Sequence, residues 1–333
     1  MATSYPDRTN ARGIWTLDDI TKNLLTEGTF PTAGQIGVFC GGYAPSLVDT
    51  IDYINTSSTG DATDFGDLVT AAGYSSTTGS FTRCINTGQN TGSYVTNIDY
   101  FQFVTTGDAA DFGDLTVART YMGATSSTTK AVFGPGRISG DGPTNVLDFI
   151  TIATLGNAVD FGDVTAARRN VASCCSPTRG IVAGGEESPG TVNTIEFWQF
   201  TTAGNSVDFG NLTGVRQDFT GCSNSKRGVF MGGNPATAGI EIIQIASLGD
   251  AVDFGDLTQT VAPAGSTGPS NPTRGIRGGG SLDPATSNVI DYINFESAGN
   301  AADFGDLSVT RQAVSGSSNG HGGLDVFDPT TRI

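Results

Sequence analysis

The sequence predicts an all-β fold, a six-bladed β-propeller of four-stranded antiparallel blades, preceded by a short helical segment. Three observations lead to this prediction. An acidic Asp-Phe-Gly motif recurs six times in the 333 residues, at intervals of 45 to 50 residues. Within each interval, short apolar runs follow one another in the same order and alternate with a two-residue period rather than a helical one. Glycine is abundant, with 47 residues, which favours many turns over long helices.

Each repeat unit has the same internal order. A basic residue precedes an apolar strand that ends in a glycine pair, as in residues 179–185 (RGIVAGG). An alternating strand follows, then a Gly-Asn or Gly-Asp turn, the Asp-Phe-Gly strand and a short polar strand. The alternating strands are expected at 48–54, 97–103, 146–152, 194–200, 240–245 and 289–295. We expect the repeated phenylalanines to fill the gaps between blades: Phe65, Phe112, Phe161, Phe209, Phe254 and Phe304.

The two ends of the repeat region predict how the ring closes. The first unit begins at its glycine-pair strand, residues 37–42, and lacks a polar strand before it. The last unit ends with a surplus polar strand within residues 311–319. We therefore expect the C-terminal strand to pair with the first blade, which would leave no open sheet edge. This divides the chain into a propeller at 34–333 and an N-terminal segment at 1–33.

The N-terminal segment contains one expected helix. Thr16 and Asp19 form a possible capping pair, and Gly28 and Pro31 end the helical pattern. A single short helix is marginal alone and has to dock, either on its own propeller or on a neighbouring protein. We treat residues 1–33 as an assembly handle, whose candidate contact residues are Trp15, Leu17, Ile20 and Leu24.

The recurring acids admit two interpretations. The alternating strands and the positions flanking Phe-Gly hold 17 of the 33 acidic residues. Repeated oxygen ligands would suit Ca²⁺, with candidate ligands at Asp61, Asp64, Asp67, Asp108, Asp111 and Asp114. Their spacing is not that of an EF-hand loop, so we favour a structural role. In that interpretation the first Asp or Asn is a left-handed turn residue, and the later acids pair with recurring Arg and Lys residues.

Composition excludes several classes of function. A net charge of −16 argues against a nucleic-acid partner, and a single histidine, His321, argues against multi-histidine metal sites. The five cysteines lack zinc-like spacing, and adjacent Cys174 and Cys175 could form a vicinal disulfide or pack as reduced side chains. There is no signal peptide and no 18-residue apolar run, so we expect cytoplasmic synthesis without membrane insertion. We predict no cofactor and no enzymatic activity, because the carboxylates are repeated rather than set apart as one site.

Two resemblances narrow the prediction. The apolar strand ending in Gly-Gly, followed by a strand such as IDYI, resembles kelch-type propellers over residues 36–325, although the usual tryptophan is missing. Residues 13–17 (GIWTL) with 28–31 (GTFP) resemble a segment of bacteriophage tail and tail-fibre proteins, with Phe30 where tryptophan is usual. The repeat at 111–119 (DFGDLTVAR) resembles repeats of phage virion structural proteins, marine ones especially.

The second resemblance implies a non-enzymatic virion protein. It would be a propeller of the tail (fibre, tip or baseplate), oligomeric within the particle and bound to other virion proteins. A host surface glycan or receptor is the further partner that it implies. A capsid-decoration or head-fibre protein, a lectin-like glycan-binding propeller and a hydrolase remain alternatives. The polar loops that differ between units, 134–145, 184–193 and 278–288, are the candidate contact regions.

Overall fold

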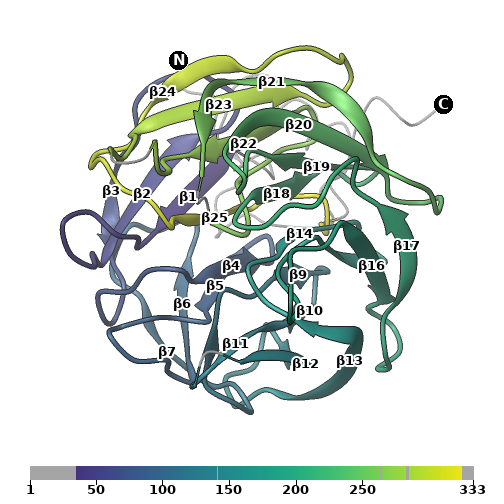
Figure 1. Ribbon diagram of the computed structural model, residues 1–333. Coiled ribbons are helices and arrows are strands. Elements are labelled where there is room, and N and C mark those ends of the chain that lie inside the picture. Colours follow the sequence, from purple (N-terminus) through teal and green to yellow (C-terminus); the bar gives the residue numbers. More distant parts are fainter. Residues whose placement is uncertain (1–34, 141, 263–264, 283–284, 325–333) are drawn as a thin grey trace, which may run out of the picture. The chain divides into compact units, whose positions relative to one another are not determined.

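The computed structural model describes residues 35–140, 142–262, 265–282 and 285–324. These residues form strands β1 to β25 and no helix, so none of them forms a helix that could cross a bilayer. The strands make six small antiparallel sheets arranged as the blades of a propeller (Figure 1). The all-β, six-bladed prediction is therefore confirmed. The chain divides into units at residues 1–32 and 33–333, and the predicted N-terminal helix lies outside the described residues.

We number the blades by the order of their Asp-Phe-Gly motifs and give the strands from the ring centre outward. Blade 1 is β25 (Ser315–Ser318), β1 (Ile36–Cys40), β2 (Thr50–Asn55) and β3 (Thr63–Asp67), and blade 2 is β4 (Ser76–Gly79), β5 (Arg83–Thr87), β6 (Asn97–Gln102) and β7 (Ala110–Asp114). Blade 4 is β14 (Ala172–Cys175), β15 (Arg179–Ala183), β16 (Thr194–Gln199) and β17 (Val207–Asn211), and blade 5 is β18 (Thr220–Ser223), β19 (Arg227–Met231), β20 (Thr237–Gln244) and β21 (Val252–Val261).

The other two blades depart from the predicted four strands. Blade 3 contains β9 (Ala124–Ser126), β10 (Lys130–Phe133), β12 (Pro143–Thr151) and β13 (Val159–Arg168), with β8 (Arg119–Thr120) and β11 (Gly136–Ile138) added at one end. Blade 6 has only β22 (Arg274–Gly278), β23 (Val289–Asn294) and β24 (Ala302–Asp306). Residues 266–271 run beside β22 in the innermost position, but Pro269 has no N–H to donate to a ladder.

The chain ends of the propeller meet in blade 1. Strand β25 pairs with β1 in antiparallel register, with Gly37 opposite Ser318 and Cys40 opposite Ser315. This is the pairing expected from the surplus C-terminal strand, and it makes the first blade from both ends of the repeat region. Unfolding of blade 1 therefore separates residues nearly 280 positions apart, as between Phe39 and Gly316.

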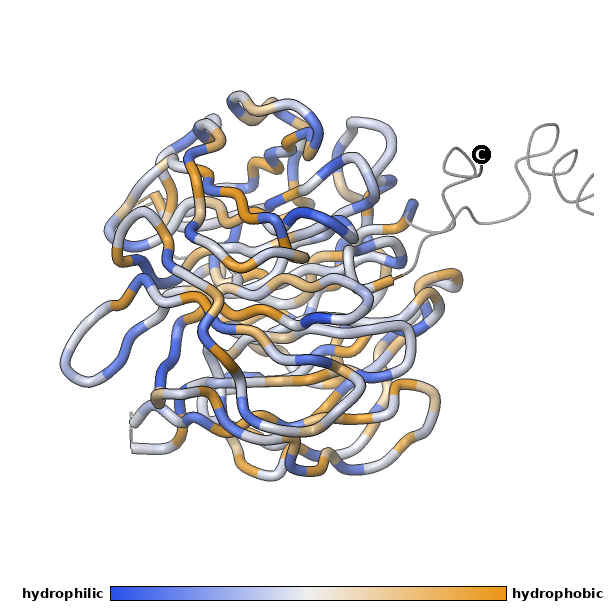
Figure 2. The backbone as a smooth tube through the Cα atoms, turned by 90° about the vertical axis from the view of Figure 1, so that its right-hand side faces the viewer, coloured by the Kyte–Doolittle hydropathy of each residue, from blue (hydrophilic) through white to orange (hydrophobic). Residues whose placement is uncertain are grey.

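The apolar core lies between adjacent blades rather than in one central mass. One buried cluster joins Val38 and Ile51 of blade 1 to Phe101 of blade 2, and the other clusters bridge neighbouring blades in the same way. In Figure 2 the hydrophobic colour accordingly appears as short stretches repeated along the strands. All six repeat phenylalanines are buried in these layers, and Phe65 packs with its ring 5.2 Å from that of Phe101 in the next blade.

The repeated acidic segment is the joint between blades. Gly156 and Ala158, which precede the motif of blade 3, donate backbone hydrogen bonds to Phe112 O and Asp114 O of blade 2, at 3.0 and 2.7 Å. The side chain of Asn157 accepts a bond from the N–H of Asp114 at 3.1 Å. The same bond, from a backbone N–H to an Asp or Asn side chain of the next blade, recurs at every joint. The donor and acceptor pairs are Asp67–Asp108, Asp114–Asn157, Asp163–Asn205, Asn211–Asp250, Asp256–Asn300 and Asp306–Asp61.

This geometry corrects the predicted role of the first Asp or Asn. It is the preceding glycine, with φ of 148° at Gly156, that has the positive backbone angle, and Asn157 is free to cap the neighbouring blade. The glycine of the motif is required as well. A Cβ at Gly162 would lie 2.5 Å from the carbonyl carbon and oxygen of Gly204 in blade 4, and φ there is 146°.

We expect Gly162→Ala to destabilise the propeller by about 1–3 kcal/mol or more, because a backbone atom of the next blade blocks the added methyl group. Gly214→Ala is the matched control, since Gly214 is exposed and a Cβ added there would have nothing within 4 Å. Thermal unfolding of both variants measures the difference. Equal melting temperatures for the two variants would contradict the proposed joint.

Candidate functional site

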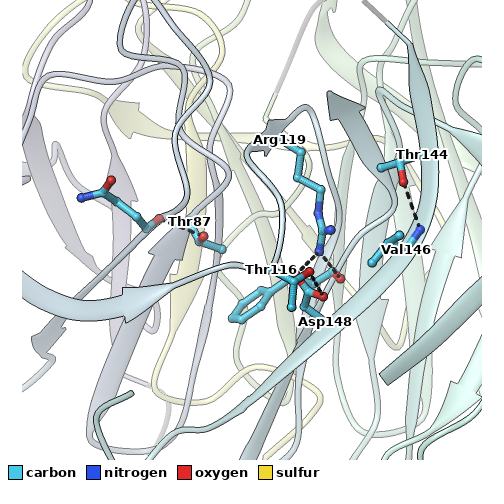
Figure 3. Close-up of polar contacts among 8 residues, drawn as sticks. Thr87, Thr116, Arg119, Thr144, Val146 and Asp148 are labelled. Carbon is cyan, nitrogen blue, oxygen red and sulfur yellow. Dashed lines mark hydrogen bonds and ion pairs between the residues drawn. The ribbon is translucent and has the colours of Figure 1, made fainter. Parts of the chain in front are cut away.

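The acids of the alternating strands form buried ion pairs between blades. Asp148 of β12 is fully buried and accepts bonds from the N–H and hydroxyl of Thr116, at 3.1 and 2.7 Å. Arg119, also fully buried, donates to the same carboxylate at 2.8 Å (Figure 3). Thr116 follows the motif of blade 2, so this cluster ties blade 2 to blade 3, whose sheet also includes Arg119 in β8. A buried carboxylate needs this density of donors to stay charged.

The same arrangement occurs at five of the six acids of the alternating strands. Burial lowers the pKa of each arginine, and it takes the pKa of Arg277 to about 10 while raising that of Asp291. The prediction that arginine pairs with the acids flanking Phe-Gly was wrong, because those acids face outward and are mostly exposed. The pairs observed are Arg119–Asp148, Arg168–Glu196, Arg216–Glu241, Arg277–Asp291 and Arg311–Asp52.

Asp99 is the exception, and its surroundings explain why. The preceding unit has Val69 and Ala72 where most units have Thr or Ser and Arg, so the usual donors are missing. Gln89 stands at the second position of the glycine pair and donates to Asp99 at 2.6 Å. In blade 5 a glycine at this position makes room for the arginine, since a Cβ at Gly233 would lie 2.7 Å from Arg216 Cγ. Burial raises the pKa of Asp99 to about 6.

The centre of the ring is lined by small and polar side chains and is closed at one end. The innermost strands carry Ser, Thr, Ala, Gly and Cys, and the space left among them is about 20 Å³, room for about one water. His321 donates from Nε2 to Gly79 O at 2.9 Å and accepts from the N–H of Gly323 at Nδ1. Burial lowers the pKa of His321 to about 4, so the ring is neutral near pH 7. Residues 319–324 therefore act as a plug.

The opposite mouth of the ring has an unusual backbone. Four residues with polar or aromatic side chains and one alanine have positive φ, between 53° and 58°, in the left-handed region that non-glycine residues rarely adopt. Their backbones form a row of four hydrogen bonds around the mouth, in which the N–H of each residue after Ala313 donates to the carbonyl of the one before it, at 2.9–3.2 Å. In order around the mouth they are Ala313, Tyr74, Tyr121, Asn170 and Asp218.

Four of these residues, all except Ala313, line a pocket of about 170 Å³ at the mouth. Its walls are Tyr74, Tyr121, Arg137, Arg169, Asn170, Glu186 and Asp218. The Tyr74 and Tyr121 rings lie with centroids 4.3 Å apart, and the guanidinium carbon of Arg137 lies 5.5 Å from the centroid of the Tyr121 ring. Strained backbone and converging polar groups in one concavity are typical of binding sites. We therefore take this mouth pocket as the candidate functional site.

The electrostatics of the mouth pocket are nearly balanced. Arg169 forms a bidentate pair with Glu186, with N–O distances of 2.9 and 3.2 Å. Asn170 donates from Nδ2 to Asp218 at 2.8 Å, while its buried Oδ1 has no hydrogen-bond partner among the described residues. Burial raises the pKa of Asp218 to about 6, and burial together with neighbouring Tyr74 raises that of Tyr121.

Sequence reasoning found the region but missed most of the residues. Arg137 and Glu186 belong to two of the variable loops, 134–145 and 184–193. The four left-handed residues of the pocket were not singled out. A signal was present, because each lies nine positions after its repeat phenylalanine, and this position holds Tyr, Tyr, Asn and Asp in units one to four. A position that varies among polar and aromatic residues inside a near-constant repeat indicates a local role beyond packing.

The remaining candidate residues are placed elsewhere or not described. Asp61 and Asp108 cap neighbouring blades, and the other suggested calcium ligands, Asp64, Asp67, Asp111 and Asp114, are exposed at the outer edge. The described part of the chain contains no group of three or more His, Cys, Asp or Glu that could hold a metal ion. All five cysteines are free and buried. Trp15, Leu17, Ile20 and Leu24 lie outside the described residues.

We expect Asp99→Asn to stabilise the protein at pH 8 by about 1 kcal/mol, because wild type must ionise a buried acid there and the variant need not. The folded-state pKa of Asp99 is about 6, above its ordinary value of 3.8, so its favourable contribution is present below pH 4 and is lost as the pH rises to about 6. The gain should therefore vanish near pH 4. Chemical unfolding across this pH range measures it.

Asp148→Asn is the matched control for that experiment. It removes the partner of a fully buried arginine, so we expect a loss of about 3 kcal/mol or more at pH 8. Effects of the same sign in the two variants would contradict the assignment of paired and unpaired acids.

The mouth pocket is thus the site that the tertiary structure singles out. No protein-family model and no curated protein matches this chain, so what the pocket binds has to be inferred from its own side chains.

Proposed function

We propose that this chain is a non-enzymatic propeller of a bacteriophage virion, attached to the tail by one face and presenting the other face to the host. The observation that carries the proposal is the separation of features between the two ends of the ring. The first described residues lie at the plug end, where Ile36 N–H donates to Asn319 at 3.0 Å. The mouth pocket and the variable loops lie at the other end of the inner strands.

This separation suits a protein that is attached at its plug end while its pocket face stays exposed. The first described strand, β1, begins at the plug end, so attachment of the propeller at that end would leave the pocket face uncovered. Backbone joints at every blade boundary, together with five buried ion pairs, make a rigid support for the surface loops.

The kelch-like type belongs to the same proposal. The glycine pairs that end the second strand have positive φ at both positions in blades 1, 4, 5 and 6, as at Gly184 and Gly185. Blades 2 and 3 keep only the first glycine, followed by Gln89 and Pro135. We assign the propeller to a kelch-like class on this repeated strand and turn order, and the N-terminal helix to the handle.

Deletion of residues 1–33 tests the attachment. We expect the truncated chain to unfold at about the wild-type temperature and to be absent from purified phage particles, whereas the full chain copurifies with them. Immunolabelling should place the full chain on the tail. Normal incorporation of the truncated chain would contradict the handle, and absence of the full chain from particles would contradict the virion role.

A further inference from the structure

The mouth pocket has unused hydrogen-bond acceptors. Asn170 Oδ1 is buried without a partner among the described residues, although its amide nitrogen is engaged with Asp218. Asp218 is partly buried, is hydrogen-bonded to the side chains of Asn170 and Gln217, and lies beside the Arg169–Glu186 pair. A carboxylate has more acceptor sites than these two contacts fill, so it can still accept from a ligand. A buried acceptor left without a donor is costly, and a ligand that brings hydroxyl donors removes this cost.

The pocket also offers aromatic surface. Tyr74 and Tyr121 present two rings whose planes are inclined by 31°, and both border the cavity. A ligand that suits this wall has an apolar face to pack on a ring and polar groups around its edge. A pyranose has both, because its C–H groups gather on one face and its hydroxyls project outward. The volume, about 170 Å³, suits a single sugar ring rather than an oligosaccharide or a peptide segment.

The charges favour a neutral ligand over an anion. Arg169 is already paired in bidentate fashion with Glu186, and the guanidinium of Arg137 lies over the rings of Tyr121 and Tyr94. An anionic ligand would therefore face the carboxylates of Asp218 and Glu186 without a guanidinium reserved for it. Hydroxyl groups can donate to Asn170 Oδ1 and to the carboxylate of Asp218, which an anion cannot do.

We propose that the mouth pocket binds one neutral pyranose unit of a surface polysaccharide, with Asn170 and Asp218 accepting from its hydroxyls and a tyrosine ring against its C–H face. This inference rests on the proposed function for its biological setting, since a virion propeller with this face exposed would meet a host glycan there. The strained ring of positive-φ residues holds the four pocket side chains in place before the sugar arrives. Such preorganisation lowers the entropic cost of binding.

The test uses the full chain and a panel of methyl pyranosides of glucose, galactose, mannose and N-acetylglucosamine, with binding followed by saturation-transfer NMR and calorimetry. We expect at least one of them to bind with a millimolar Kd, as for a single sugar in a small pocket. Tyr121→Asn removes the ring but keeps a residue type that tolerates positive φ, and Asp218→Asn removes the charge in the same way. Each should weaken binding by about tenfold or more.

Tyr43→Asn is the matched control, since Tyr43 is an exposed tyrosine at the same end of the propeller that does not line the pocket. It should leave binding unchanged, and melting curves should show that all three variants fold. Failure of every pyranoside to bind wild type would overturn the proposal, as would equal binding by Tyr121→Asn. Binding of acetate, phosphate or methyl glucuronide in place of the neutral sugars would overturn it in favour of an anion site.

The two proposals can fail separately. Pyranoside binding by a protein that is absent from particles would leave the sugar site standing and remove the virion role. A protein found on tails that binds no sugar would do the reverse.

Discussion

The structure depends on one repeated contact, in which the acidic segment of each blade binds the same segment of the blade before it. The Gly-Asn-Ala part of one copy provides the donors and the cap, and the Phe-Gly-Asp part of the previous copy provides the carbonyls, the N–H and the close backbone approach. Because each copy has both halves, the contact runs head to tail and is completed only when the sixth copy meets the first, through Asp306 and Asp61. The acidic segment is thus repeated because each copy contains both halves of the joint.

Buried charge is the second element of this joint, and it shows how the repeat tolerates change. Arg168, Arg216 and Arg311 reach carboxylates in the next blade, the latter two past Gly233 and Gly42. Arg119 lies in β8 of the blade 3 sheet, and in blade 6 Arg277 comes from the same blade as its partner. In blade 2 the arginine is missing and Gln89 occupies both the glycine position and the role of donor to Asp99. The acid is therefore kept with a different donor, but Asp99 is less well satisfied than the others, since its buried Oδ1 has no hydrogen-bond partner among the described residues.

The two ends of the ring differ in how far their side chains are constrained by the contacts that hold the blades together. At the plug end, His321 and its neighbours fill the centre with direct bonds and leave room for about one water. At the mouth, the chain crosses from one blade to the next through left-handed residues, whose backbones are bonded in a row and whose side chains are not needed for the fold. Those side chains can vary, and in units one to four they have become polar or aromatic. The candidate site is built from them and from Arg137, Arg169 and Glu186.

The sequence by itself determined the blade number, the strand order and the closing strand, because period, alternation and the glycine pairs are local signals that each strand carries independently. It did not determine which acids pair with which bases. Asp148 and Asp160 belong to acidic positions that both recur with the same period as the arginines. Only the three-dimensional structure shows that Asp148 is buried against Arg119, whereas Asp160 is exposed. Nor did it show that Tyr74, Tyr121, Asn170 and Asp218, about 48 residues apart in sequence, lie side by side. The arrangement of the blades around one axis brings them together, because each of these residues lies just before the innermost strand of its blade.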